Sequence, residues 1–212
     1  GPLPPPMGGD TRHFKTLLAD LQAHAEFAVT VIDTSRGTQH SNPWRNAWVS
    51  LRVLLGLALR LKATDVVSYQ ASDRGMFLFG PLVVAMCRMA RRPCILRVFG
   101  GSFGDAWRTQ PGWRRALTRR TLLRADVLLL QTQRAVREIQ PHARARVEWF
   151  STYIESPGPA PATPPAQRCT RFVFLGHLWR TKGVETLLAV AARLPAGCSI
   201  DLYGTPDEYT AE

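Results

Sequence analysis

The sequence predicts an α/β protein built on a parallel sheet, and three patterns indicate this fold class. Short apolar runs of strand length recur along the chain, and stretches with helical spacing separate most of them. Many of the runs end at glycine or polar residues. A proline-rich segment, with five prolines in residues 156–166, divides the alternation into two series. We therefore expect an N-terminal domain over 1–155, a semi-stiff linker over 156–167 and the beginning of a second domain over 168–212.

The first nine residues combine a proline run with two glycines, and a helical pattern follows them. Asp10 or Thr11 is expected to cap a helix with Phe14, Leu17, Leu18 and Leu21 on one face. Gly8 and Gly9 are then either part of an irregular start or a glycine loop that a ligand approaches at the helix N-terminus.

The rest of the N-terminal domain alternates between the two element types. We expect strands at 27–33, 65–69, 94–99, 126–130 and 146–150, and helices at 44–62, 75–91, 111–124 and 133–140. This rhythm is typical of a doubly wound parallel sheet, in which ligands bind beyond the carboxyl ends of the strands. Asp33, Gln70, Gly100, Gly101 and Gln131 are expected at such ends.

The second domain opens with a strand, a glycine turn and a helix. Phe172–Leu175 is uninterrupted and apolar, which predicts a strand buried on both faces and ended by Gly176. The loop after it carries Arg180 and Lys182 before a helical pattern, and residues 199–203 form a second strand. Unpaired N–H groups at a helix N-terminus favour an anion such as phosphate. His177 is either an ordinary loop residue or a donor to a phosphate or sugar.

The composition limits the binding partners and the cellular compartment that we expect for this protein. The net charge of +11 favours an anionic partner, although only three of the 27 basic residues are lysines. Four separated cysteines, with no CxxC, predict reduced core thiols and a cytoplasmic protein. No apolar run is long enough to span a bilayer. The Walker A, GxGxxG, HExxH and GxSxG motifs are absent, as is any His/Cys cluster with metal-ligand spacing.

A strongly basic segment lies between Cys87 and Arg124, with ten arginines and one acid. It has three interpretations: a solvated basic face, a nucleic-acid surface without a known signature, or an interfacial surface for anionic lipid. In the third, the membrane-facing residues are Trp113, Arg114, Arg115, Arg119 and Arg120, and the protein is peripheral to the inner face of the plasma membrane.

Several of these stretches together resemble the family 4 glycosyltransferases. Residues 172–188 are similar to that family's strand, G-R-L-x-x-x-K-G loop and V-x-x-L-L helix start. The opening P-P-P-M-G-G resembles its N-terminal glycine loop. Residues 96–103 and 125–130 are similar to its middle segments, and the landmarks follow one another in the family's order along most of the chain.

The resemblance implies a GT-B fold, with two Rossmann-like domains facing each other across a cleft. It also implies a retaining, metal-independent transfer of sugar from a nucleotide-sugar, such as a UDP- or GDP-sugar, to a saccharide or lipid-linked acceptor. Lys182 matches the family's phosphate-binding lysine, and Gly8 and Gly9 match the loop near donor phosphate or acceptor. Gly100–Ser102, with Ser102 at the turn, would line the cleft, as would Gln70. No cofactor other than the substrate is implied.

Two departures from the family pattern limit the resemblance. His177 stands where the family has an arginine, so that Arg180 would have to complete the diphosphate clamp with Lys182. The family's E-x7-E motif is not found in these 212 residues. We therefore expect a chain truncated in the second domain and at the N-terminus, and inactive by itself. A non-catalytic phospho-ligand-binding module and a sugar-nucleotide epimerase are the alternatives.

Overall fold

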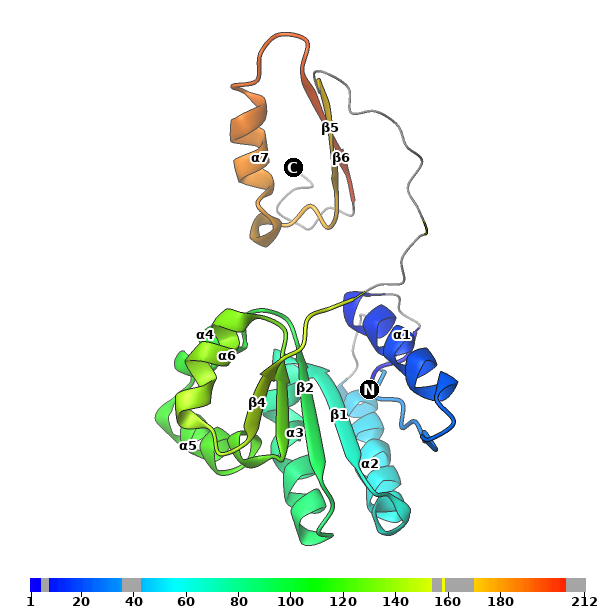
Figure 1. The fold of residues 1–212 in the computed structure, drawn as a ribbon. Coiled ribbons are helices and arrows are strands. Elements are labelled where there is room, and N and C mark those ends of the chain that lie inside the picture. Colours follow the sequence, from blue (N-terminus) through cyan, green and yellow to red (C-terminus); the bar gives the residue numbers. More distant parts are fainter. Residues whose placement is uncertain (5–7, 36–42, 154–157, 159–169, 205–212) are drawn as a thin grey trace. The chain divides into compact units, whose positions relative to one another are not determined.

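The computed structural model describes residues 1–4, 8–35, 43–153, 158 and 170–204. The chain divides into two compact units, Gly1–Ser156 and Pro157–Glu212 (Figure 1). The division falls inside the proline-rich segment that the sequence predicts as a linker. Most of that linker, residues 159–167, lies outside the described residues.

The first unit contains a four-stranded sheet in which every neighbouring pair is parallel. Its strands are β1 (Val67–Ser72), β2 (Cys94–Phe99), β3 (Val127–Leu130) and β4 (Arg146–Trp149). Together with the helices between them they form a Rossmann-like α/β fold, which confirms the predicted class. The strand over 94–99 has the predicted bounds, whereas β1 extends to Ser72 instead of ending at Tyr69.

The strand order β1-β2-β3-β4 follows the chain order, with no reversal. Four helices connect successive strands: α3 (Asp73–Met89), α4 (Phe103–Arg108), α5 (Gly112–Arg120) and α6 (Gln133–Ile139). Because parallel crossovers are right-handed, successive connections in one direction place their helices on one face of the sheet. The expectation of a doubly wound sheet, with helices on both faces, stays a prediction.

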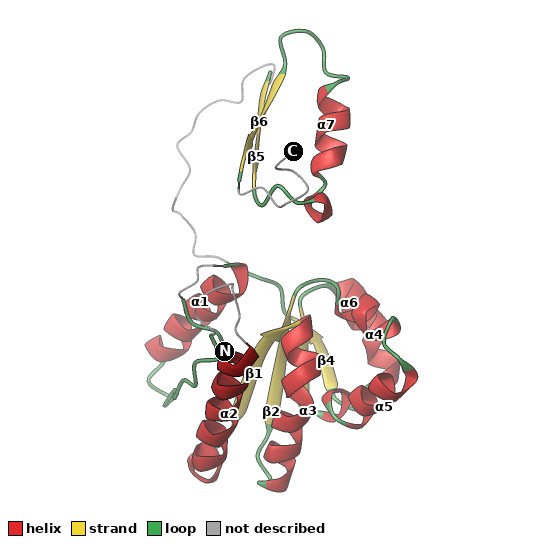
Figure 2. Ribbon diagram, turned by 180° about the vertical axis from the view of Figure 1, so that it is seen from behind, coloured by secondary structure: helices red, strands yellow, loops and turns green. Residues whose placement is uncertain are grey.

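The core lies between the sheet and these connecting helices, with α3 in front of the sheet in Figure 2. Leu96, Val98, Leu128 and Leu130 alternate toward this side, and all four are buried. The thiols of Cys87 and Cys94 are free and buried in the same core, as predicted. Cys198 is free and half-buried, and Cys169 lies outside the described residues.

The opposite face of the sheet is covered unevenly, since Arg97 and Phe99, which alternate toward it, are buried. Ile95, Val127 and Leu129 point to it and are only half-buried.

The predicted first helix is α1 (Gly9–Ala23), with Phe14 buried. Its N-cap is Gly8 rather than Asp10 or Thr11: the Gly8 N–H donates to the Thr11 hydroxyl at 2.9 Å.

The strand predicted over 27–33 is not present: that segment pairs with no other strand among the described residues. Phe27, at its start, is exposed. The predicted long helix is α2 (Pro43–Arg60), followed by a 3-10 turn over Leu61–Ala63. Leu57 and Leu61 join the core, whereas the larger part of its apolar face is exposed.

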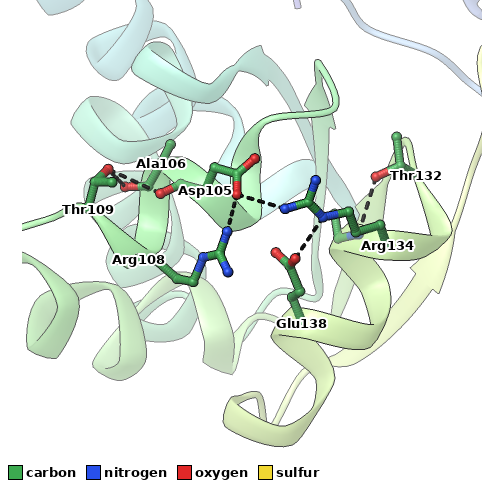
Figure 3. A network of polar contacts seen from close by, with 8 residues as sticks. Asp105, Ala106, Arg108, Thr109, Thr132, Arg134 and Glu138 are labelled. Carbon is green, nitrogen blue, oxygen red and sulfur yellow. Dashed lines mark hydrogen bonds and ion pairs between the residues drawn. The ribbon is translucent and has the colours of Figure 1, made fainter.

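Helix α4 was not predicted, and it packs on α6 through ion pairs (Figure 3). The Asp105 carboxylate accepts from Arg108 on its own helix and from Arg134 of α6 at 3.1 Å. Arg134 also pairs with Glu138 at 2.9 Å. The helix predicted over 111–124 is likewise divided into α5 and a 3-10 turn, Leu122–Arg124, whose two leucines are fully buried.

The second unit consists of β5 (Arg171–Leu175), a 3-10 turn over Arg180–Lys182, α7 (Val184–Ala191) and β6 (Ser199–Tyr203). The two strands pair in parallel, from Arg171 with Ser199 to Leu175 with Tyr203. The prediction that residues 172–175 are buried on both faces is wrong: Val173 and Leu175 are exposed. A two-stranded sheet with one helix covers little apolar surface.

Candidate functional site

The carboxyl edge of the four-stranded sheet brings together polar groups from three strand ends. Asp73 begins α3 immediately after β1, and Ser102 follows the two glycines after β2. The Ser102 hydroxyl donates to Asp73 Oδ2 at 2.5 Å. Asp73 Oδ1 is buried without a hydrogen-bond partner among the described residues. One carboxylate oxygen at this edge is therefore held and the other is unpaired.

The glycine turn after β2 depends on a backbone conformation that favours glycine. Gly100 has φ of 103°, and its N–H donates to Gln131 Oε1 at 2.6 Å. The Gln131 carbonyl accepts from Trp149 Nε1 at 3.1 Å. A Cβ on Gly101 would lie 3.2 Å from the Thr132 methyl group. Gly100, Gly101 and Ser102 thus lie beside Gln131 at the predicted edge.

Two acidic groups at this edge are perturbed toward their neutral forms. Burial raises the pKa of Asp73, and the hydrogen bond from Ser102 opposes that rise. Burial also raises the pKa of Asp10 near the start of α1; His13 opposes the rise and the nearby Asp73 charge adds to it. Sequence reasoning missed both carboxyls as site residues. Asp10 was considered only as a helix cap, and Asp73, directly after β1, was not singled out.

Gly8 and Gly9 are exposed at the N-terminus of α1. A Cβ on Gly9 would meet nothing within 4 Å, and one on Gly8 would only touch Thr11 Oγ1 at 4.0 Å. Packing within the protein therefore does not require glycine at either position. Open space beside a helix N-terminus is compatible with the predicted ligand approach.

Gln70 lies inside β1, not at its end, and is buried beside Arg97. Arg97 is 2% exposed, and its Nη1 lies 3.5 Å from Gln70 Oε1. Its guanidinium carbon is 5.0 Å from the Phe99 ring centre and 4.3 Å from that of Phe150. Burial lowers the pKa of Arg97. Gln70 is therefore part of a buried polar layer rather than an accessible strand end.

In the second unit, the loop after β5 carries the predicted anion-binding residues. Gly176 ends the strand, and its N–H donates to the Tyr203 carbonyl at 3.0 Å. The His177 ring stacks on Trp179 with centres 4.7 Å apart. Arg180 Nε pairs with Glu185 Oε2 at 3.2 Å. The side chain of Lys182 is exposed and forms no ion pair with another described residue.

Gly183 gives α7 its start, with φ of 79° at the N-cap. Lys182 thus lies directly before a helix N-terminus and beside the carboxyl ends of β5 and β6. Gly204 follows β6, and a Cβ there would lie 1.7 Å from the Gly176 carbonyl oxygen. The two strand ends approach each other too closely for any side chain at Gly204.

The predicted membrane-facing residues lie on α5 and are all exposed. Trp113 is 66% exposed, with the Arg114 guanidinium 5.0 Å from its ring centre. A surface hollow of about 390 Å³ is lined by Gly112, Arg115, Ala116, Arg119 and Arg120. This hollow is basic but contains none of the groups at the carboxyl edge.

Among the described residues, no group of three or more His, Cys, Asp or Glu side chains is arranged to hold a metal ion. Nor does any described helix combine the length and hydropathy that a membrane span needs. No known protein family, curated protein or solved structure matches this chain. The fold and the two loop regions define the class: an α/β protein with a Rossmann-like parallel sheet.

Proposed function

We propose that this chain belongs to a metal-independent, retaining glycosyltransferase with a GT-B arrangement, which moves sugar from a nucleotide-sugar to a saccharide or lipid-linked acceptor. The observation that carries the proposal is the position of Lys182. It precedes the glycine-capped N-terminus of α7, at the carboxyl end of a parallel strand pair. The order of the family-like motifs along the chain supports the same function.

In the proposed reaction, charge develops on the departing diphosphate. Lys182 and the unpaired N–H groups at the start of α7 stabilise it without a metal ion. His177 offers a ring N–H from the same loop. Arg180 contributes less as long as Glu185 holds it, because that carboxylate neutralises the cation and repels an anion.

The carboxyl edge of the first unit would serve the acceptor. Asp73, Ser102 and the N–H group of Gly9 are suited to hydroxyl groups. The nucleotide base and the sugar are not assigned. A phospho-ligand-binding module without transfer is the second candidate, and the pairing of Arg180 with Glu185 favours it, because the pair leaves a weaker clamp for a leaving group.

Calorimetric titration with UDP and GDP tests the proposed diphosphate site around Lys182. Lys182→Ala is expected to weaken diphosphate binding about tenfold, the loss of one charge-assisted contact. Lys62→Ala, an exposed lysine of the other unit, is the matched control and should bind as the parent does. The role of Lys182 is rejected if both variants bind equally well.

A turnover assay distinguishes the glycosyltransferase from the phospho-ligand-binding module. Release of UDP or GDP from a panel of nucleotide-sugars, measured on the protein as its gene encodes it, is expected for the transferase. Tight diphosphate binding with no release or transfer on any donor would instead support the binding module.

A further inference from the structure

Helix α2 carries an apolar stripe whose side chains are exposed. Its members recur at spacings of four, three, four and four residues, which is one face of a helix: Trp44, Trp48, Leu51, Leu55 and Leu59. Trp44 and Leu59, at the two ends, are each 83% exposed. The opposite side of α2 supplies Leu57 and the following Leu61 to the core. Core packing therefore does not explain the stripe.

Helix α3 exposes a second stripe beside the first. Leu78, Leu82 and Met89 are exposed at helical spacing, while Met76, Val83 and Cys87 face the core. Figure 2 shows α2 and α3 next to each other on one side of the sheet, and both contribute to one core cluster. Each stripe is larger than a singly exposed leucine.

Most charges near the two stripes are positive, although Asp65 is an exposed acid just after α2 and its 3-10 turn. Residues 43–64 contain no Asp or Glu, and Arg52, Arg60 and Lys62 are exposed on or just after α2. Arg88 and Arg91 are exposed at the end of α3. An apolar stripe flanked by cations and carrying tryptophans at one end is complementary to an anionic lipid surface. A second copy is a poorer occupant, because it would bring these cations against each other.

We infer that the exposed faces of α2 and α3 dock on an anionic membrane surface. The helices lie in the interface, with the tryptophans and leucines among the acyl chains and the arginines at the headgroups. This inference goes beyond the proposed function and does not depend on sugar transfer. It also differs from the α5 surface predicted from the sequence, since it assigns the apolar contact to α2.

Vesicle flotation of the 212-residue chain tests the inference. The parent is expected to float with phosphatidylcholine vesicles that contain about 30% phosphatidylglycerol, and weakly with phosphatidylcholine alone. Leu59→Glu and the double change Leu51→Glu, Leu55→Glu are expected to lower the bound fraction about tenfold. Because these side chains are exposed, circular dichroism and melting should match the parent.

Matched variants locate the contact. Leu188→Glu, an exposed leucine on α7 of the other unit, should float like the parent. Trp113→Glu on α5 should retain most of the binding. The inference is overturned if the parent does not float, if the α2 variants float normally, or if Trp113→Glu alone abolishes flotation. It is also overturned if the parent is a dimer that Leu59→Glu dissociates, since the face would then be a protein interface.

Discussion

The Ser102 hydroxyl donates to the Asp73 carboxylate at 2.5 Å and so joins the ends of β1 and β2. The two residues are 29 positions apart, and their contact depends on the parallel register that places Ser72 opposite Phe99. Asp73 is consequently held at the carboxyl edge with one oxygen paired and the other buried without a partner.

Asp73 should make stability depend on pH. Its pKa is raised in the folded state. Its contribution to the free energy of unfolding is therefore fully present below the unfolded value of about 4, where the carboxyl is neutral, and is lost as pH rises through the folded pKa. Asp73→Asn should therefore gain stability relative to the parent between about pH 4 and pH 7. Urea unfolding at the two pH values measures this difference.

Two variants check the assignment to Asp73. Ser102→Ala removes the hydrogen bond that lowers the pKa of Asp73, so the pH dependence should become steeper. Asp65→Asn, at an exposed acid just before β1, should leave it unchanged. An Asp73→Asn variant that unfolds with the parent's pH dependence would show that another group is responsible.

Arg97 should tolerate an apolar replacement better than its burial suggests. Its Nη2 is buried without a hydrogen-bond partner among the described residues, and Arg97 forms no ion pair with any of them. Arg97→Met keeps the stem between Phe99 and Phe150 and removes a desolvated charge. The free energy of unfolding should stay within about 1 kcal/mol of the parent's or exceed it.

The truncation Arg97→Ala is the comparison for that variant. It also deletes the packing between the two rings and should cost about 2 kcal/mol. A loss above about 3 kcal/mol for Arg97→Met would point instead to a charged partner of the guanidinium.

Gly80 should be required by packing between α3 and the turn after α5. An added Cβ would lie 2.5 Å from Leu122 Cδ2 and 3.1 Å from Met76 Sδ, and both side chains are fully buried. Gly80→Ala should lower the free energy of unfolding by about 1 to 3 kcal/mol through overpacking. Gly112→Ala, also in a helix but with nothing within 4 Å, should change it by less than about 1 kcal/mol.

Gly204 should be irreplaceable in the second unit. A Cβ there would overlap the Gly176 carbonyl oxygen, which is backbone and cannot turn away like a side chain. Gly204→Ala should abolish the amide exchange protection of β6. Gly176→Ala places its Cβ 3.4 Å from the Phe174 ring, an ordinary contact, and should retain that protection. Equal protection in both variants would contradict the close approach.

Glu185 should weaken diphosphate binding by Arg180 and Lys182. Glu185→Gln releases Arg180 from its ion pair and removes a negative charge from the loop. Under the proposed function, affinity for UDP should rise about threefold, with the gain suppressed by salt. The double change Arg180→Ala, Glu185→Gln should lose the gain. A Glu185→Gln variant with weaker binding would assign the carboxylate to the ligand instead.

Local patterns predicted the elements that have a partner within the described residues. Residues 94–99 and 199–203 form strands with the predicted bounds, since each has a strand-like pattern and pairs with a neighbour. Residues 27–33 have an equally apolar pattern but no ladder partner, so the pattern alone was misleading. Helix α4 was missed because Gly100–Ser102 indicates a loop, and Phe103 and Trp107 give only one helical repeat.

The candidate site was partly visible in the sequence. Glycines after strands located the carboxyl edge, because turns of this kind need a backbone such as that of Gly100. Asp73 was not singled out, since an acid in the first turn of a helix is common for dipole reasons. Residue spacing does not encode the side-chain positions that produce the hydrogen bond between Asp73 and Ser102 and the ion pair between Arg180 and Glu185.

The sequential order of the four strands has a consequence for how the first unit folds. Each parallel pairing joins consecutive strands and closes only a loop of a few tens of residues, so the entropy of closure is small at each step. The sheet can then grow one strand at a time from β1 and β2 as the chain leaves the ribosome. In stopped-flow experiments, substitutions of core residues in β2 should slow folding. Substitutions in β4 should mainly accelerate unfolding.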